Sequence, residues 1–225
     1  MTSTRPRAVA FDVLETLLTI EPLRARLSEI GQPPELLQAW FMRFQRDSMA
    51  LGLSGDFGAF RDVARQALRT DTGHTASEQD VEYVLDGFAE MPAHPDAEPA
   101  LRRLSEEGVR VGCLTVGDPE ATANFLERAG LARHVDQVVT AEQAGLWKPA
   151  PAIYRATAYR LGVAPRDMAL VAVHAWDCHG AKRAGCSAGW CSRLEGEYGD
   201  VFTPADATAD DLVTLTERLL GLPAR

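Results

Sequence analysis

One stretch constrains the fold more than any other: the apolar run Ala8-Val9-Ala10-Phe11, which ends in a single carboxylate, Asp12. Consecutive apolar residues without alternation are typical of a strand buried on both faces of a parallel sheet. Such sheets bind their ligands at the carboxyl ends of the strands, where Asp12 would lie. Asp12 is therefore either a reactive group at that edge or a cap for the next turn, and this stretch alone leaves both open.

Beyond Thr16 the pattern changes from strand to helix. Apolar residues recur at helical spacing over four segments, with Asp56 and Ser77 as expected N-caps: 22–30, 34–51, 57–69 and 78–90. Four successive helices do not fit an alternating sheet. We therefore interpret residues 19–92 as a helical cap domain inserted into an α/β core domain made of residues 1–18 and 93–225.

From residue 96 onward helices and strands alternate. The predicted helices cover 96–107, 119–129, 150–161, 180–185 and 210–220. The predicted strands cover 109–115, 135–140, 168–173 and 188–193. With the first strand, this makes five strands joined by helical crossovers, which predicts an α/β fold with a doubly wound, Rossmann-like parallel sheet.

Composition narrows the choice of partners. The formal net charge of −9 argues against nucleic acid or an anionic membrane surface. No apolar run reaches the roughly 18 residues that span a bilayer, and the first seven residues lack the apolar core of a signal peptide. The four cysteines form no Cys-x-x-Cys pair. We expect a cytoplasmic protein with reduced thiols that acts on a small molecule, and a homodimer is left open.

Four polar residues fall at the ends of predicted strands or in the loops just after them: Asp12, Thr115, Lys148 and Asp177. Each alone has an ordinary structural explanation. Thr115 and Asp177 could cap neighbouring turns, and Lys148 could be a surface lysine. Together, at one edge of one sheet, they indicate a shared site.

These positions and the helical insertion resemble the haloacid dehalogenase (HAD) superfamily over nearly the whole chain. The motifs that carry the resemblance are Phe11-Asp12 with Thr16, Thr115, Lys148-Pro149 and Trp176-Asp177. Within the superfamily, Lys148-Pro149 with Tyr154 and the Trp176-Asp177 pair most resemble the type II, or L-2-haloacid, dehalogenases.

The resemblance implies a nucleophilic role for Asp12, which would form an aspartyl ester with the substrate. Lys148 would keep Asp12 ionised, because an opposite charge favours the charged form. Thr115 and Thr16 would donate hydrogen bonds that position the reacting groups. Asp177 would serve the hydrolytic half of the reaction.

The residue two positions after the nucleophile separates two chemistries. Phosphatases of this superfamily carry an aspartate there that protonates the leaving alcohol, whereas this chain has Leu14, which transfers no proton. We therefore expect a dehalogenase-like hydrolase of small carboxylic acids that needs no cofactor or metal. The alternatives are a HAD-type phosphatase with Mg²⁺, or a catalytically silent binding protein of the same fold.

The chain departs from the dehalogenase pattern around the halide site. The arginine that follows a tryptophan in that branch is Phe41 here, with Arg43 nearby, and Val116 replaces an asparagine. Ala172 and His174 replace a serine and an asparagine. We expect an apolar wall on one side of the cleft between core and cap, made of Leu14, Phe41, Val116 and Ala172. The expected substrate contacts are Thr16, Leu14, Phe41, Arg43, Val116, His174, Tyr154 and Trp176.

Two further residues have no settled role in the sequence. Glu15 stands where this family usually has a glycine. His174 and His179 flank Asp177 and could be structural or could bind a metal, and His174 could instead act as a general base toward the water that cleaves the ester.

Overall fold

The computed structural model describes residues 4–224, and its centre is a parallel sheet. The strands are β1 (Ala8–Phe11), β2 (Arg110–Thr115), β3 (Gln137–Thr140), β4 (Met168–Ala172), β5 (Ser187–Cys191) and β6 (Ala207–Ala209). Their order across the sheet is β3-β2-β1-β4-β5-β6, and every pairing is parallel. The predicted fold class is confirmed.

Strand β1 lies at the centre of the sheet, and its four residues are buried. Phe11 pairs with Cys113 of β2 on one side and with Val171 of β4 on the other. The strand order reverses between β1 and β4, and a crevice for ligands forms at such a switch point in doubly wound sheets. Asp12 follows β1 directly at this point.

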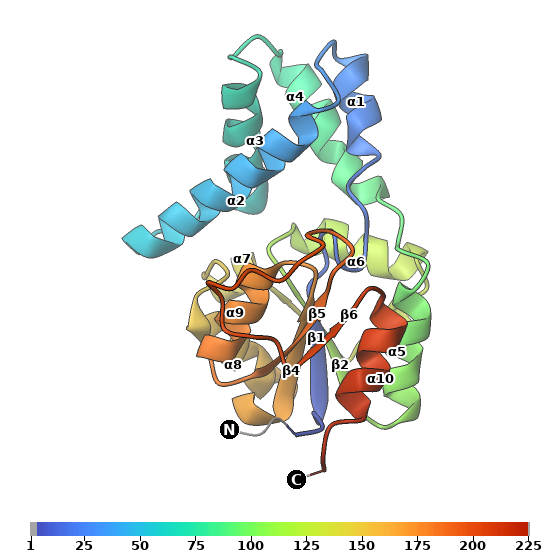
Figure 1. The fold of residues 1–225 in the computed structure, drawn as a ribbon. Helices are drawn as coiled ribbons and strands as arrows, with labels where there is room; N and C mark the ends of the chain where they lie inside the picture. Colours follow the sequence, from blue (N-terminus) through green and yellow to red (C-terminus); the bar gives the residue numbers. More distant parts are fainter. Residues whose placement is uncertain (1–3, 225) are drawn as a thin grey trace.

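Helices cover both faces of the sheet (Figure 1). On one face α5 (Ala97–Glu106) packs against α10 (Leu212–Leu220), and on the other α8 (Pro151–Arg160) packs against α9 (Ala175–Arg183). The remaining core elements are α6 (Pro119–Arg128), α7 (Ala141–Ala144) and the 3-10 turns η2 (Ala132–His134) and η3 (Pro165–Asp167).

A separate group of helices lies beyond the carboxyl ends of the strands (Figure 1). It contains α1 (Leu23–Glu29), α2 (Leu36–Ser54), α3 (Phe60–Asp71), α4 (Glu78–Asp86) and the 3-10 turn η1 (Gly87–Glu90). The chain enters and leaves this group at one place, where Thr19 N donates to Pro92 O (3.1 Å) and His94 N donates to Leu17 O (2.8 Å). These bonds support the proposed division between a cap of residues 19–92 and a core.

The structure differs from the sequence expectation in several elements. Helix α9 begins at Ala175 rather than at residue 180, and β6 and α7 were not predicted. Asp56 is not a helix cap, because α3 begins later, after Ala59. Ser77 is the cap of α4, in a reciprocal capping box with Asp80, as predicted.

Two other expectations concern composition. All four cysteines are buried and form no disulfide. Within residues 4–224, no helix is both long and apolar enough to cross a membrane.

Candidate active site

Asp12 is the centre of a buried polar cluster at the carboxyl end of β1. Its side chain is almost fully buried, and its backbone N–H donates to Val171 O of β4 (2.9 Å), which fixes the residue against both central strands. Lys148 Nζ donates to Oδ1 (2.9 Å) and Thr16 Oγ1 donates to Oδ2 (2.7 Å). Thr16 in turn accepts from Val173 N (3.1 Å). The carboxylate is therefore held on both oxygens.

Lys148 bridges Asp12 to a second carboxylate. Its Nζ also donates to Asp177 Oδ2 (2.7 Å), while Tyr154 Oη donates to Asp177 Oδ1 (2.5 Å). These side chains come from three elements: Lys148 from the loop before α8, Tyr154 from α8 and Asp177 from the first turn of α9. Asp177 and Tyr154 are fully buried.

The charges in this cluster shift the pKa values of the Asp12 and Asp177 carboxyl groups in opposite directions. Burial alone raises the pKa of Asp12, but the Lys148 and His174 charges outweigh burial and hold that pKa well below its ordinary value. Burial raises the pKa of Asp177, and the nearby Asp12 charge adds to the rise. Burial lowers the pKa of Lys148, but its two carboxylate partners raise it by more. Asp12 is thus the more acidic carboxyl group of the pair, as a nucleophile requires.

His174 lies on the other side of Asp12. Its Nδ1 is 3.5 Å from Asp12 Oδ2, and its Nε2 is 2.8 Å from Glu15 Oε2. Burial lowers the pKa of His174, but Asp12 and Glu15 raise it to about 10. The ring is therefore an imidazolium when Asp12 is ionised. Glu15 has a left-handed backbone, with φ of 67°, which explains why glycine suits this position in the resembled family.

A cavity of about 490 Å³ opens between the sheet and the helices above it. From the core it is lined by Glu15, His174, Trp176, Leu194 and Glu195. From the helical layer it is lined by Ile20, Glu21, Arg24, Leu37, Gln38, Phe41, Met42 and Gln45. Sequence reasoning missed Arg24, whose Nε pairs with Glu21 (2.6 Å). The sequence gave no functional signal for Arg24, because an arginine in an amphipathic helix is typical of a face turned to solvent.

Comparison with known proteins identifies this architecture. The family model described as haloacid dehalogenase-like hydrolase matches residues 6–185. The (S)-2-haloacid dehalogenase 4A of Burkholderia cepacia is 30% identical over 184 residues, which is 80% of each chain. The chain belongs to the haloacid dehalogenase-like hydrolase family.

Two further relatives carry names of different activities, a dehalogenase and a phosphatase. A crystal structure of an L-2-haloacid dehalogenase superposes with a TM-score of 0.89 at 26% identity, over 97% of this chain and 99% of the other. A phosphoserine phosphatase of Thermus thermophilus is 33% identical over 162 residues, covering 70% of this chain and 64% of the relative. Matches over nearly the whole of both chains include several (S)- or L-2-haloacid dehalogenases, which confirms the type II branch indicated by the motifs.

Not every predicted site residue joins the cluster of this hydrolase. Thr115 is buried at the end of β2, where its Oγ1 accepts from Gly117 N (2.9 Å). Arg43 does not line the cavity, because its Nε pairs with Asp71 of α3 (2.5 Å). Within residues 4–224, neither side chain forms a hydrogen bond or an ion pair with the Asp12 carboxylate.

The apolar wall expected on one side of the cleft is not formed. Phe41 lines the cavity beside His174, whereas Leu14 faces a separate, nearly filled pocket below Phe60 and Phe88. Val116 is half-buried and lines neither space, and Ala172 is enclosed within β4. The cause is packing: Leu14 forms a bridge with Leu18 beside the separate pocket, and Ala172 pairs with Trp190 inside the sheet, so neither lines the cavity.

The donor set of this hydrolase fits a divalent cation poorly. Both oxygens of Asp177 are bonded, to Lys148 and to Tyr154, and the lysine ammonium lies between the two carboxylates. His179 Nδ1 accepts from Thr203 N (3.0 Å), so this histidine has a structural role. Among residues 4–224, no three acidic, histidine or cysteine side chains are grouped as metal ligands.

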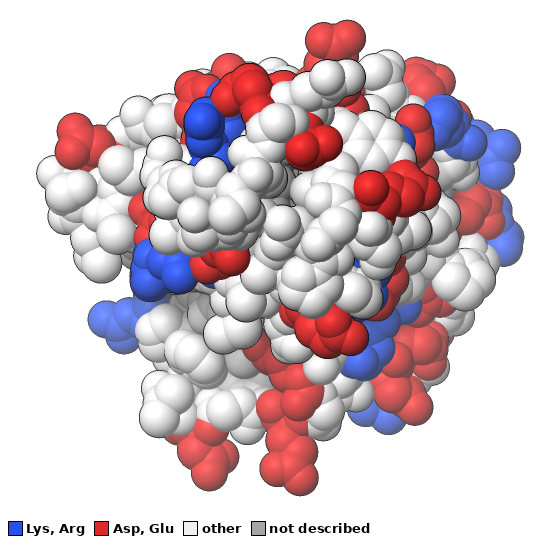
Figure 2. All heavy atoms as spheres, turned by 90° about the horizontal axis from the view of Figure 1, so that it is seen from above, with Lys and Arg blue, Asp and Glu red and all other residues white. Residues whose placement is uncertain are grey.

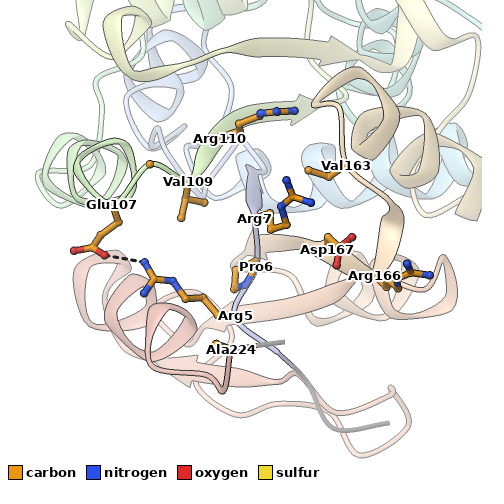
Figure 3. Close-up of a pocket in the computed structure, with 11 residues that line it drawn as sticks. Arg5, Pro6, Arg7, Glu107, Val109, Arg110, Val163, Arg166, Asp167 and Ala224 are labelled. Atoms are coloured by element: carbon orange, nitrogen blue, oxygen red, sulfur yellow. Dashed lines mark hydrogen bonds and ion pairs between the residues drawn. The ribbon is translucent and has the colours of Figure 1, made fainter.

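A second cavity, of about 630 Å³, lies at the opposite edge of the sheet (Figure 3). It is lined by residues at or just before the amino ends of β1, β2 and β4, among them Arg5, Arg7, Arg110 and Asp167. Arg5 pairs there with Glu107 (2.7 Å). None of the cluster around Asp12 reaches this cavity, so we assign the candidate active site to the carboxyl edge.

Proposed function

We propose that this hydrolase displaces a leaving group from the carbon next to the carboxylate of a small acid, by way of an aspartyl ester on Asp12. The observation that carries the proposal is the state of Asp12: buried, ionised, held by Lys148 and Thr16, and next to His174, which lines the cavity. A buried carboxylate kept ionised and fixed in direction suits nucleophilic attack.

The reaction would proceed in two displacements. One oxygen of Asp12 attacks the substrate carbon, and the carbon–halogen bond breaks with its electron pair leaving as halide. Water then attacks Cγ of Asp12, the bond from Cγ to the ester oxygen breaks, and a 2-hydroxy acid leaves. Lys148 supplies positive charge at Oδ1 throughout.

The halide needs no proton to depart, which agrees with the position of Leu14. A leaving alcohol would need an acid at that position, and an alkyl side chain cannot supply it.

We also propose that residues 19–92 act as a cap over this site and that the enzyme works without a cofactor in the cytoplasm. The free, buried cysteines are compatible with a reducing compartment.

The first prediction tests the nucleophile. A panel of 2-halo acids is incubated with the enzyme and with Asp12→Asn, with and without a chelator, and halide release and intact protein mass are measured. We expect halide release with chelator present, a transient mass increase equal to the substrate without its halogen, and loss of both by at least about a thousandfold in a folded Asp12→Asn variant.

The opposing outcomes are distinct. Full halide release by Asp12→Asn would remove the nucleophile from the mechanism. Phosphate release from phosphomonoesters that stops with chelator and returns with Mg²⁺ would favour the phosphatase, which the Thermus thermophilus relative represents.

A further inference from the structure

The hydrolytic half of this reaction needs a base, and Asp177 is poorly placed to be one. Its Oδ1 accepts from Tyr154 and its Oδ2 accepts from Lys148, and the side chain is fully buried. Lys148 also separates it from Asp12. A water approaching Asp12 from the cavity would meet a different group.

That group is His174, which lines the cavity and faces the nucleophile. Its Nδ1 is 3.5 Å from Asp12 Oδ2, beyond hydrogen-bond distance for a fixed contact. Among residues 4–224, Nδ1 has no hydrogen-bond partner although it is buried. Nδ1 is thus held beside the reacting carboxylate by charge and not by a hydrogen bond, and it becomes available to a water once that charge is lost in the ester.

The same geometry argues against a role for His174 in receiving the halide. In an in-line displacement the leaving group departs on the side of the carbon opposite to the attacking oxygen. A nitrogen 3.5 Å from that carboxylate lies on the near side.

Glu15 determines which nitrogen of His174 is free. Its carboxylate accepts the Nε2 proton (2.8 Å), so Nδ1 carries the lone pair when the ring is neutral. Glu15 holds this position with a left-handed backbone, with φ of 67°, which is strained for a residue other than glycine. Its backbone oxygen also contacts His94 Nε2 (3.2 Å). Glycine would avoid the strain but would leave His174 without its acidic partner.

We propose that Glu15 and His174 form the base of the hydrolytic step, with His174 Nδ1 taking the proton of the water that attacks the Asp12 ester. This inference rests on the aspartyl ester of the proposed function. His174 is then a catalytic residue, and Glu15 is a positioning residue that acts through it.

Ester formation on Asp12 converts His174 from an imidazolium into a neutral ring that can act as a base. In the free enzyme the Asp12 carboxylate keeps His174 protonated, and after ester formation that charge is gone while burial still favours the neutral ring. The other charged groups that face the cavity have partners of their own, so their effect on His174 stays nearly the same when the ester forms. Glu21 and Arg24 of the cap pair with each other, and Glu195 accepts from Ala175 N and Trp190 Nε1.

The proton balance closes over one cycle. His174 loses its Nδ1 proton to solvent once the ester has formed and the halide has left. Neutral Nδ1 takes a proton from water as its oxygen bonds to Cγ, and returns it to the alkoxide oxygen of the departing 2-hydroxy acid. Asp12 emerges as a carboxylic acid and passes its proton to Nδ1, which restores the imidazolium. One proton and one halide are released for each substrate.

The experiment separates ester formation from ester hydrolysis. His174→Gln is mixed with a 2-halo acid that the parent enzyme converts, and the adduct is followed by intact protein mass. We expect one halide per enzyme in a burst, accumulation of the adduct to near full occupancy, and a kcat lowered by about 100-fold or more.

A second variant tests Glu15 by a readout that a structural role would not move. The acid limb of kcat against pH reports His174 in the ester intermediate, and Glu15→Gln should move this limb to lower pH by about one unit. Glu127→Gln, which removes an exposed carboxylate of α6 outside this cavity, should leave the position of the limb unchanged.

Two results overturn the inference while the proposed function stands. One is a folded His174→Gln variant that turns over without accumulating adduct. The other is an acid limb that does not move in Glu15→Gln. Absence of any adduct in the parent enzyme and in His174→Gln would instead overturn the aspartyl ester, and this inference with it.

Discussion

Lys148 is a buried charge that depends on two partners. Its ammonium is almost fully buried between Asp12 and Asp177, two carboxylates that are themselves buried. A buried charge is tolerated only with close partners, and removing one partner leaves the others uncompensated.

We predict that Lys148→Met abolishes turnover and lowers the free energy of unfolding by about 3–5 kcal/mol at pH 8. Without the ammonium, the folded-state pKa values of the two carboxyl groups rise above their unfolded values. The folded state then binds more protons than the unfolded state, so the stability of the variant falls as pH rises from 5 to 8.

Urea denaturation at both pH values measures this. Lys182→Met is the matched control, because Lys182 pairs with Asp206 (2.6 Å) at a partly exposed position and should cost less. Equal stability losses at pH 5 and pH 8 for Lys148→Met would contradict the assigned charge states.

At the residue scale the sequence identified most members of the polar cluster, but not the hydrogen bonds and ion pairs between them. Asp12, Thr16, Lys148, Tyr154 and Asp177 could be found because strand ends and short motifs mark them. The partner of His174 could not, because Glu15 is distant from it along the chain and only the turn after β1 brings the two together. The ion pair that withdraws Arg43 from the cavity likewise depends on how two helices pack.

Among the elements, the loop between α7 and α8 connects the core to the helices above it. Trp147 in this loop stacks on Phe57 with ring centroids 5.0 Å apart and meets the edge of Phe44 at 5.9 Å. Its side chain is almost fully buried, although it belongs to a loop. The residue beside Lys148 is therefore an anchor for the helical layer.

We predict that Trp147→Ala lowers the free energy of unfolding by about 3–5 kcal/mol, since a large aromatic side chain leaves a cavity at this contact. It should also lower kcat, because the backbone of Lys148 loses a fixed neighbour. Trp147→Phe keeps part of the stacking and should lose less of both. Denaturation and halide release measure these effects, and a loss below about 1 kcal/mol in Trp147→Ala would show that this contact does not anchor the layer.

Two of the features that sequence reasoning missed, the start of α9 and strand β6, have determinants that are not local. Helix α9 begins at Ala175 because Glu195, beyond the next strand, accepts the first N–H (2.9 Å). Strand β6 has only three residues and is set by pairing with β5. Helices with strong apolar spacing, such as α2 and α5, were predicted to within three residues.

At the scale of the whole molecule, net negative charge opposes an anionic substrate. Acidic and basic side chains are interspersed over the face that carries the cap, with wide uncharged areas between them (Figure 2). The formal net charge of −9 gives an overall repulsion that salt screens.

We predict that kcat/KM for a 2-halo acid rises about twofold between roughly 10 mM and 150 mM salt, because the Debye length falls from about 30 Å to 8 Å. The amide of the same acid carries no charge and should show no such rise. Initial rates with both substrates measure the effect. A fall in kcat/KM for the acid would mean that local positive charge at the site dominates the approach.

The hydrogen bonds between Thr19 and Pro92 and between Leu17 and His94 bring both connections of the helical layer to one point. A segment whose two ends meet can be replaced by another of different length without stretching the sheet. The helical layer could therefore be exchanged as a unit, because Asp12, Lys148 and Asp177 all lie outside it. Grafting another helical layer at this junction would present the same chemistry to a different molecule.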